Sequence, residues 1–184
     1  MNGHHLVLGE LRDRITGNSL ADTHDERYRQ KIAALLLDRK GYRKNDIQPR
    51  YPLVARAGDK KAVVPVDFIV TVAGRTAMII KYAPGSLVTR HRSVLAASRL
   101  ITPYQVPVAV ITNGQDADVL WADRGTLMDR GLDGIPDRKR LEAIAADFDF
   151  ASISPQRAER ESRIFYVYEV DGACPCDDTI CRLE

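Results

Sequence analysis

The chain has 184 residues, of which 45% are hydrophobic and 28% charged, and its formal net charge is +2. This composition is that of one folded domain with an ordinary core, and it excludes a chain that is disordered throughout. The charge does not by itself indicate a nucleic-acid partner, although local clusters of Lys and Arg can still form a binding surface. No stretch is apolar enough to span a bilayer, and residues 1–20 lack the apolar core of a secretory signal, so we expect a cytoplasmic protein without a membrane partner.

The first half of the chain predicts a leader, a helix and three strands. Residues 1–22 have mixed polarity and no sustained period, which is typical of a leader. Thr23 followed by Glu26 forms a capping box, which predicts a helix to about Lys40. Runs rich in Val and Ile then predict strands at 47–57, 63–72 and 76–82, with Pro49 and Pro52 indicating an irregular or edge start to the first of them.

The second half predicts helices that alternate with two short strands. Helices are expected at 89–100, 136–148 and 155–164, a buried strand at 106–111, another strand at 117–122, and a last strand or extended tail at 165–170. Two antiparallel hairpins followed by a helical crossover give an α/β fold with a mixed central sheet flanked by helices. We therefore expect a leader over 1–22, a core domain over 23–150, and a helix with a cysteine-containing tail over 151–184.

Several short motifs follow one another in a particular order. Glu26 lies on the first helix, "VPVDFIV" supplies Asp67 on the second strand, and "IIKYAPGS" covers the third strand and its exit. After the next helix, "AVITNG" ends in Thr112, Asn113 and Gly114, and "LDGIP" ends at Pro136. Each motif is weak alone, but their order and spacing are specific.

In this order the stretch from Asp25 to about Ile135 resembles the N-terminal domain of type I restriction enzyme R subunits, which is a PD-(D/E)XK nuclease. The resemblance implies a restriction-endonuclease-like core. It also implies a site in which an Asp on one strand and a Glu-x-Lys on the next hold Mg²⁺ and hydrolyse DNA. Glu26, Asp67 and Lys81 are then the candidate catalytic residues, and Glu26 and Asp67 the candidate Mg²⁺ ligands.

The chain departs from this pattern on the third strand. If Ala83-Pro84 is the anchor, the Glu position falls on Ile80 and the Lys position on Tyr82, and neither side chain can perform the family's chemistry. Lys81 points to the opposite face of the strand unless a bulge redirects it. We favour a retained fold with lost catalysis; the alternative is a rearranged Mg²⁺-dependent endonuclease that uses Asp67 and Lys81. Taken structurally, Asp67 is a strand-end carboxylate and Glu26 a capping-box residue.

The segment "YAPGSLVTRHRS" is unusually basic for the start of a helix. Cations there oppose the helix dipole, so we hypothesise a phosphate or nucleic-acid site. Its candidate residues are Ser86, Thr89, Arg90, His91 and Arg92. The structural alternative is a solvated cationic helix start.

Three cysteines lie close to the C-terminus, at positions 174, 176 and 181. Three thiolates are one ligand short of a common structural zinc site. Cys174, Cys176 and Cys181 therefore remain candidate ligands of zinc or an iron–sulfur cluster, with a disulfide or a tail of free thiols as the alternatives.

Three functions are thus open on the residues alone. The chain is a metal-dependent nuclease with a shifted Lys, a catalytically silent module that binds nucleic acid or a nucleotide, or an interaction protein that assembles through its C-terminal segment, with a homo-oligomer as one form of that assembly.

Overall fold

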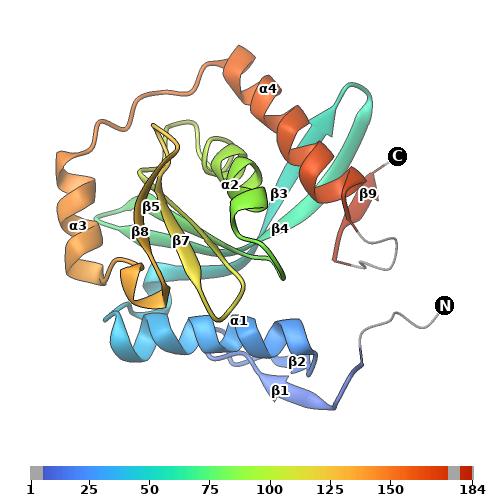
Figure 1. Cartoon of the computed structure of the whole chain (residues 1–184), viewed down its shortest axis with the longest axis vertical. Helices are drawn as coiled ribbons and strands as arrows, with labels where there is room; N and C mark the ends of the chain where they lie inside the picture. The colour runs from blue at the N-terminus through green and yellow to red at the C-terminus, as the bar shows by residue number, and fades with distance from the viewer. Residues whose placement is uncertain (1–5, 174–178, 184) are drawn as a thin grey trace.

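The computed structural model describes residues 6–173 and 179–183, and its centre is one mixed β-sheet (Figure 1). The sheet order is β3-β4-β5-β6-β7-β8. Strand β9 pairs with the first residues of β4, which extend beyond the part of β4 that pairs with β5. The strands are β3 (Ile47–Ala57), β4 (Lys60–Val72), β5 (Arg75–Tyr82), β6 (Val108–Thr112), β7 (Ala117–Trp121), β8 (Thr126–Arg130) and β9 (Cys181–Leu183).

The described strands pair antiparallel except at the middle of the sheet, where β5 and β6 run parallel. A tight turn at Ala73 and Gly74, both with positive φ, joins β4 to β5. The helix α2 (His91–Ser98) carries the chain from β5 to β6. A parallel pair needs such a crossover, and β6 is buried along its whole length. The predicted mixed sheet with a helical crossover is therefore confirmed.

Helices cover both faces of the sheet (Figure 1). On one face α1 (His24–Ala34) and α3 (Arg138–Asp147) pack against the sheet, and on the other face α2 packs with α4 (Pro155–Tyr166). Single turns extend or connect them: η1 (Leu35–Arg39) and η5 (Val167–Asp171) are π-helical, and η2 (Lys44–Asp46), η3 (Val88–Arg90) and η4 (Leu132–Gly134) are 3-10 turns. The sheet thus separates two apolar clusters.

The N-terminal segment is more ordered than a leader. It forms a small hairpin from β1 (Glu10–Arg12) and β2 (Ser19–Ala21), which lies beside α1 (Figure 1). Strands of three residues are too short to show a period in the sequence, so periodicity did not reveal them. The buried Asp13, at the end of β1, contacts Arg50 of β3 and attaches the hairpin to the body of the protein.

The end of α4 corrects another prediction. A last strand or extended tail over residues 165–170 is wrong, because α4 continues to Tyr166 and then into the π-turn η5. Phe165, Tyr166 and Val170 are the buried residues of this stretch, which is a helical spacing. Aromatic and β-branched residues favour strands in isolation, but burial against the sheet decided the outcome here. Strand β8 was not predicted at all.

Within the described part of the chain, no helix is both long and apolar enough to cross a membrane.

Candidate functional site

Strands β4 and β5 separate at Asp67. Their ladder begins at the hairpin and stops where Phe68 pairs with Ile80. Just beyond this pair, the Asp67 side chain replaces the missing strand contact, because its Oδ2 atom accepts a 2.7 Å hydrogen bond from the backbone N–H of Tyr82. Asp67 is buried. The carboxylate is therefore held rigidly at the point where two central strands part.

The residues that follow on β5 alternate between the two faces of the sheet. Ile80 and Tyr82 belong to the apolar cluster beneath α1. Between them, Lys81 turns to the other face, where its Nζ atom lies 2.7 Å from the Glu169 carboxylate and 5.3 Å from the centre of the Phe165 ring. The structure therefore does not bring Lys81 and Asp67 together.

Arg29 of α1 occupies the place beside Asp67. Its Nε atom is 2.6 Å from Asp67 Oδ1, and its Nη1 atom is 3.7 Å from Glu26 Oε2. The guanidinium also lies over the Tyr82 ring, 5.2 Å from its centre. Burial disfavours the charged form of Arg29, but attraction to Asp67 and Glu26 outweighs it and raises the pKa of Arg29 above its usual value. A fixed cation therefore stands between the two candidate metal ligands.

Arg50 supplies a second cation to the same group. Its Nη2 atom is 2.6 Å from Glu26 Oε1, and its Nη1 atom contacts the carboxylate of Asp13. The φ of Arg50 is +49°, a conformation that costs energy in a residue with a side chain. The two ion pairs on one guanidinium stabilise this kink in β3 and join the N-terminal hairpin to α1.

Glu26 therefore has a different role from the one its sequence position indicates. The Thr23 hydroxyl does accept from the Glu26 backbone N–H at 3.1 Å, so Thr23 caps the helix. The Thr23 N–H, however, bonds to the Ala21 carbonyl, not to Glu26. The Glu26 side chain instead accepts from Arg50 and from Gln30. The capping box is thus half formed, because the charged guanidinium of Arg50 and the side-chain amide of Gln30 hold the carboxylate elsewhere.

Tyr82 closes the group on the side of α1. Its hydroxyl donates a 2.9 Å hydrogen bond to Asp25, and its ring stacks on Tyr28 with 5.9 Å between centres. Burial and the neighbouring Asp25 raise the pKa of the Tyr82 hydroxyl, so this side chain stays neutral at physiological pH. At the position that the Ala83-Pro84 anchor assigns to the expected lysine, this chain has an uncharged ring packed under a helix.

The Thr-Asn-Gly turn after β6 lies against the same helix. The Thr112 hydroxyl accepts from the Gly114 N–H at 3.0 Å, and the Asn113 side chain accepts from the N–H of Asp116 at 2.8 Å. Gly114 has φ +82°, and a Cβ atom there would lie 2.3 Å from Tyr28 Cδ1. The motif is therefore the surface on which Tyr28 packs, and only glycine fits its third position.

These residues do not fit a magnesium ion as they stand. Mg²⁺ takes six oxygen ligands and depends on carboxylates that are free to bind it. Glu26 and Asp67 are both engaged by guanidinium groups, and Ile80 contributes no oxygen. Nowhere in 6–173 or 179–183 do three or more His, Cys, Asp or Glu side chains gather as a metal ion would require. We therefore derive no catalytic step through a metal here.

The basic residues after β5 point in different directions. His91 Nε2 lies 2.7 Å from Asp118 on β7, and Arg92 Nη2 lies 3.8 Å from the buried Glu161 on α4. The backbone carbonyl of Ser86 accepts a hydrogen bond from the Thr89 hydroxyl within the same turn. Acidic partners on other elements thus account for His91 and Arg92 at this helix start, and the two side chains do not join Arg90 in one cluster.

Arg90 and Thr89 instead line a shallow hollow on the face covered by α4. Its other wall is Val167, Tyr168 and Gly172, from η5 and the residue after it. Val167 and Tyr168 are 53% and 38% exposed, which is unusual for large apolar side chains. The hollow therefore combines an arginine, a hydroxyl and an accessible aromatic ring.

Beneath this hollow, Glu169 binds two partners. Lys81 Nζ lies 2.7 Å from its Oε2 atom, and the Ser93 hydroxyl donates to its Oε1 atom. Burial disfavours ionised Glu169, but attraction to Lys81 and the hydrogen bonds from Lys81 and Ser93 outweigh it and hold the pKa of Glu169 below its ordinary value. The pair attaches η5 to the centre of the sheet.

The lowered pKa predicts how the stability of the protein depends on pH. The stabilisation by Glu169 is complete above its ordinary pKa of 4.5 and is lost as the pH falls through the lower folded value. The difference in unfolding free energy between wild type and Glu169→Gln should therefore shrink on acidification below that value, measured by urea denaturation. Glu159→Gln is the control, because Glu159 is exposed on α4, the helix that precedes η5; an equal pH trend in both variants would contradict the assignment.

Of the three candidate cysteine ligands, Cys174 and Cys176 lie outside the described residues. Cys181 is exposed on β9 and is a free thiol. The zinc or iron–sulfur prediction stays a prediction.

One known protein family matches the chain. The family model described as type I restriction enzyme R protein N terminus matches residues 24–136, which is more than half of the chain. The chain belongs to the type I restriction enzyme R protein N-terminus family. The matched region begins with α1 and ends before α3, so it contains Glu26, Arg29, Asp67 and Gly114. No curated protein and no solved structure matches the chain.

Two residues of the site, Arg29 and Arg50, were missed from the sequence. Arg29 stands three positions after Glu26, and such spacing places both on one face of a helix, so a usable signal was present. Arg50 gave no signal, because its contacts depend on the kink in β3 and on the N-terminal hairpin.

Proposed function

We propose that this protein has a restriction-endonuclease-like core that has lost hydrolysis, and that it binds nucleic acid in the cytoplasm. The observation that carries the first part is the guanidinium of Arg29 between Glu26 and Asp67. In a nuclease of this kind a divalent cation holds that place, polarises the phosphate and generates hydroxide. A guanidinium neutralises the carboxylates but offers no open coordination position for water, so the charge is balanced and the chemistry is absent.

The residues on β5 support the same conclusion. Hydrolysis needs a third oxygen ligand and a cation near the attacking water. Ile80 is fully buried and apolar, and Tyr82 is neutral and bonded to Asp25. Lys81 is bound to Glu169 on the opposite face of the sheet. A rearranged site using Lys81 would require this ion pair to break and β5 to rotate.

Plasmid cleavage tests the loss of hydrolysis. We expect no cutting of supercoiled DNA with Mg²⁺ or Mn²⁺, and no difference between wild type and Asp67→Ala in that assay. If the wild type cuts DNA and both Asp67→Ala and Lys81→Met abolish the cutting, the proposed loss of hydrolysis is refuted. The alternative, a rearranged Mg²⁺-dependent endonuclease, would then be correct.

The proposal of nucleic-acid binding is supported by the hollow of Thr89, Arg90, Val167, Tyr168 and Gly172. The Glu169 carboxylate already forms a 2.7 Å ion pair with Lys81. The positive charge of the neighbouring Arg90 is therefore not needed to neutralise Glu169. Arginine suits a phosphate, and an exposed tyrosine offers a face on which a base can stack. Single strands present both groups, and we therefore propose a single-stranded segment as the ligand of this hollow.

Two neighbouring arginines make the binding test specific. Arg90→Ala should weaken binding of a short single-stranded DNA by about tenfold at low salt and lower the salt slope by about one, because it removes one phosphate contact. Arg92→Ala should have a much smaller effect, since Arg92 faces Glu161. Fluorescence anisotropy across a salt titration measures both. Equal losses in the two variants, or no binding by the wild type, would reject the hollow as the site.

A further inference from the structure

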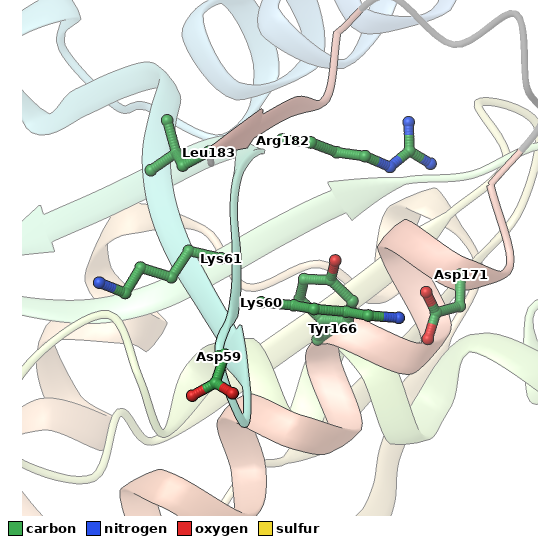
Figure 2. A pocket seen from close by; sticks show the side chains of 7 residues that line it. All are labelled: Asp59, Lys60, Lys61, Tyr166, Asp171, Arg182 and Leu183. Atoms are coloured by element: carbon green, nitrogen blue, oxygen red, sulfur yellow. The ribbon is translucent and has the colours of Figure 1, made fainter.

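A second hollow lies on the other side of η5, where three distant parts of the chain meet (Figure 2). The tip of the β3–β4 hairpin, the end of α4 with η5, and strand β9 form its walls. Its lining residues are Asp59, Lys60, Lys61, Tyr166, Asp171, Arg182 and Leu183. None of them belongs to the group around Asp67 or to the hollow at Arg90, so this pocket is separate from both.

Lysine and arginine side chains line this pocket together with two acids. Lys60 and Arg182 lie on the side of Tyr166 and Asp171, whereas the Lys61 side chain points away from them (Figure 2). Within the described residues neither Lys60 nor Arg182 forms an ion pair, although Arg182 donates a 3.2 Å hydrogen bond to the Val170 carbonyl. This bond holds the guanidinium at the wall of the pocket and leaves its other donors free. The pocket therefore offers an anion donors that no carboxylate of the described residues has taken up.

Tyr166 is the most informative residue of the pocket. Only 4% of it is exposed, and it belongs to the apolar cluster under α4. Its hydroxyl nevertheless makes no hydrogen bond with any described residue, and in Figure 2 it points towards the side of the pocket where Arg182 lies. The hydroxyl oxygen itself is reached by solvent and is not a buried atom without a partner. It is therefore free to donate a hydrogen bond to an acceptor in the pocket.

We propose that this pocket binds a phosphate group, with Lys60 and Arg182 as its cations and the Tyr166 hydroxyl as a third donor. Phosphate presents several acceptor oxygens and a charge that matches paired cations, and charge-assisted hydrogen bonds of this kind are the strong ones. The phosphate comes from a free nucleotide, a nucleic-acid backbone or inorganic phosphate. The site goes beyond the proposed nucleic-acid function and does not depend on it.

Strand β9 completes the pocket. It pairs with β4 through three residue pairs, in which Lys61 stands opposite Leu183 and Ala62 opposite Arg182. A ladder of three pairs is a weak attachment by itself. A phosphate held between Arg182 on β9 and Lys60 on the hairpin would join the two elements. Binding of phosphate should therefore also hold the C-terminal segment against the sheet.

Titration of the full-length protein with inorganic phosphate, a nucleoside monophosphate and a short single-stranded DNA tests the site. Calorimetry gives the affinity, and hydrogen exchange reports protection of residues 179–183. We expect Tyr166→Phe, which removes only the oxygen, to weaken binding of the best phosphate probe about fivefold. Lys60→Ala and Arg182→Ala should weaken it about tenfold, with partial recovery in Arg182→Lys. Lys44→Ala is the control, because this exposed lysine lies far along the chain on η2.

The three probes identify the source of the phosphate. Preference for the mononucleotide or inorganic phosphate over the oligonucleotide would assign a small-molecule site, and the reverse would assign a backbone contact; both support the pocket. Failure of all three probes to bind, or binding that Tyr166→Phe and Lys60→Ala leave unchanged, would overturn it. Arg90→Ala separates this site from the proposed nucleic-acid hollow, since it should leave phosphate binding intact.

Discussion

Replacing Arg29 by alanine should lower the free energy of unfolding by about 3 kcal/mol, the low end of the range for breaking a buried ion pair. The Asp67 side chain is 7% exposed and would keep only the hydrogen bond from the Tyr82 N–H. The Arg29 side chain is 22% exposed, so solvent weakens the ion pair. We therefore expect a loss of unfolding free energy at the low end of that range. Urea denaturation measures it.

The same variant should acquire a response to metal ions. Without the Arg29 guanidinium, Asp67 loses its ion pair while Glu26 keeps the one with Arg50, and the place between the two carboxylates is open to a cation. Millimolar Mg²⁺ or Mn²⁺ should therefore raise the melting temperature of Arg29→Ala and leave that of the wild type unchanged. Arg27→Ala is the matched control, because Arg27 lies on the same helix in an exposed pair with Asp22. A metal response in the wild type, or none in Arg29→Ala, would show that Arg29 does not stand in for a cation.

Replacing Gly114 by alanine should cost about 2–5 kcal/mol of unfolding free energy. The left-handed backbone at φ +82° contributes about 1–2 kcal/mol for any residue with a Cβ atom. The new methyl group would also lie 2.3 Å from Tyr28 Cδ1, and overpacking of this kind adds about 1–3 kcal/mol. Rotation of the ring does not relieve the clash, because the Tyr28 Cβ atom is itself only 2.7 Å away.

Gly58→Ala is the control for this substitution. Gly58 also has a positive φ, +60°, but a Cβ atom there meets nothing within 4 Å. It should therefore show only the backbone cost of about 1–2 kcal/mol. Chemical denaturation of the two variants separates the backbone cost from the cost of the clash with Tyr28. Equal losses of unfolding free energy in the two variants would mean that α1 shifts away from the new methyl group without cost. The Thr-Asn-Gly turn would then not be the surface that supports Tyr28.

Arginines of the chain itself balance most of the negative charge in the group around Asp67. Asp13, Glu26 and Asp67 carry three negative charges, and Arg29 and Arg50 return two positive charges. Buried carboxylates need partners whether or not they act in catalysis. Arginines supplied by the chain itself meet that need, with Ile80 and Tyr82 on β5 packed beside them.

The sequence alone determined the mixed α/β sheet, its crossover and the family. Runs of β-branched residues at 63–72 and 76–82, the tight turn between them and the buried run before Thr112 are local signals, and local signals survive in a single sequence. Strand alternation likewise places Tyr82 beneath α1 and Lys81 on the opposite face, because the side-chain period of a strand is two.

Only the tertiary structure decided what the charged residues do. Arg50 meets Asp13 across 37 positions, Arg29 meets Asp67 across 38, and Lys81 meets Glu169 across 88. Such pairs depend on how elements pack, and no spacing along the chain encodes them. The same holds for residues 165–170, where contact with the sheet selected a helix over the strand that their residue types favour, because burial outweighs a propensity that spans only about 1 kcal/mol.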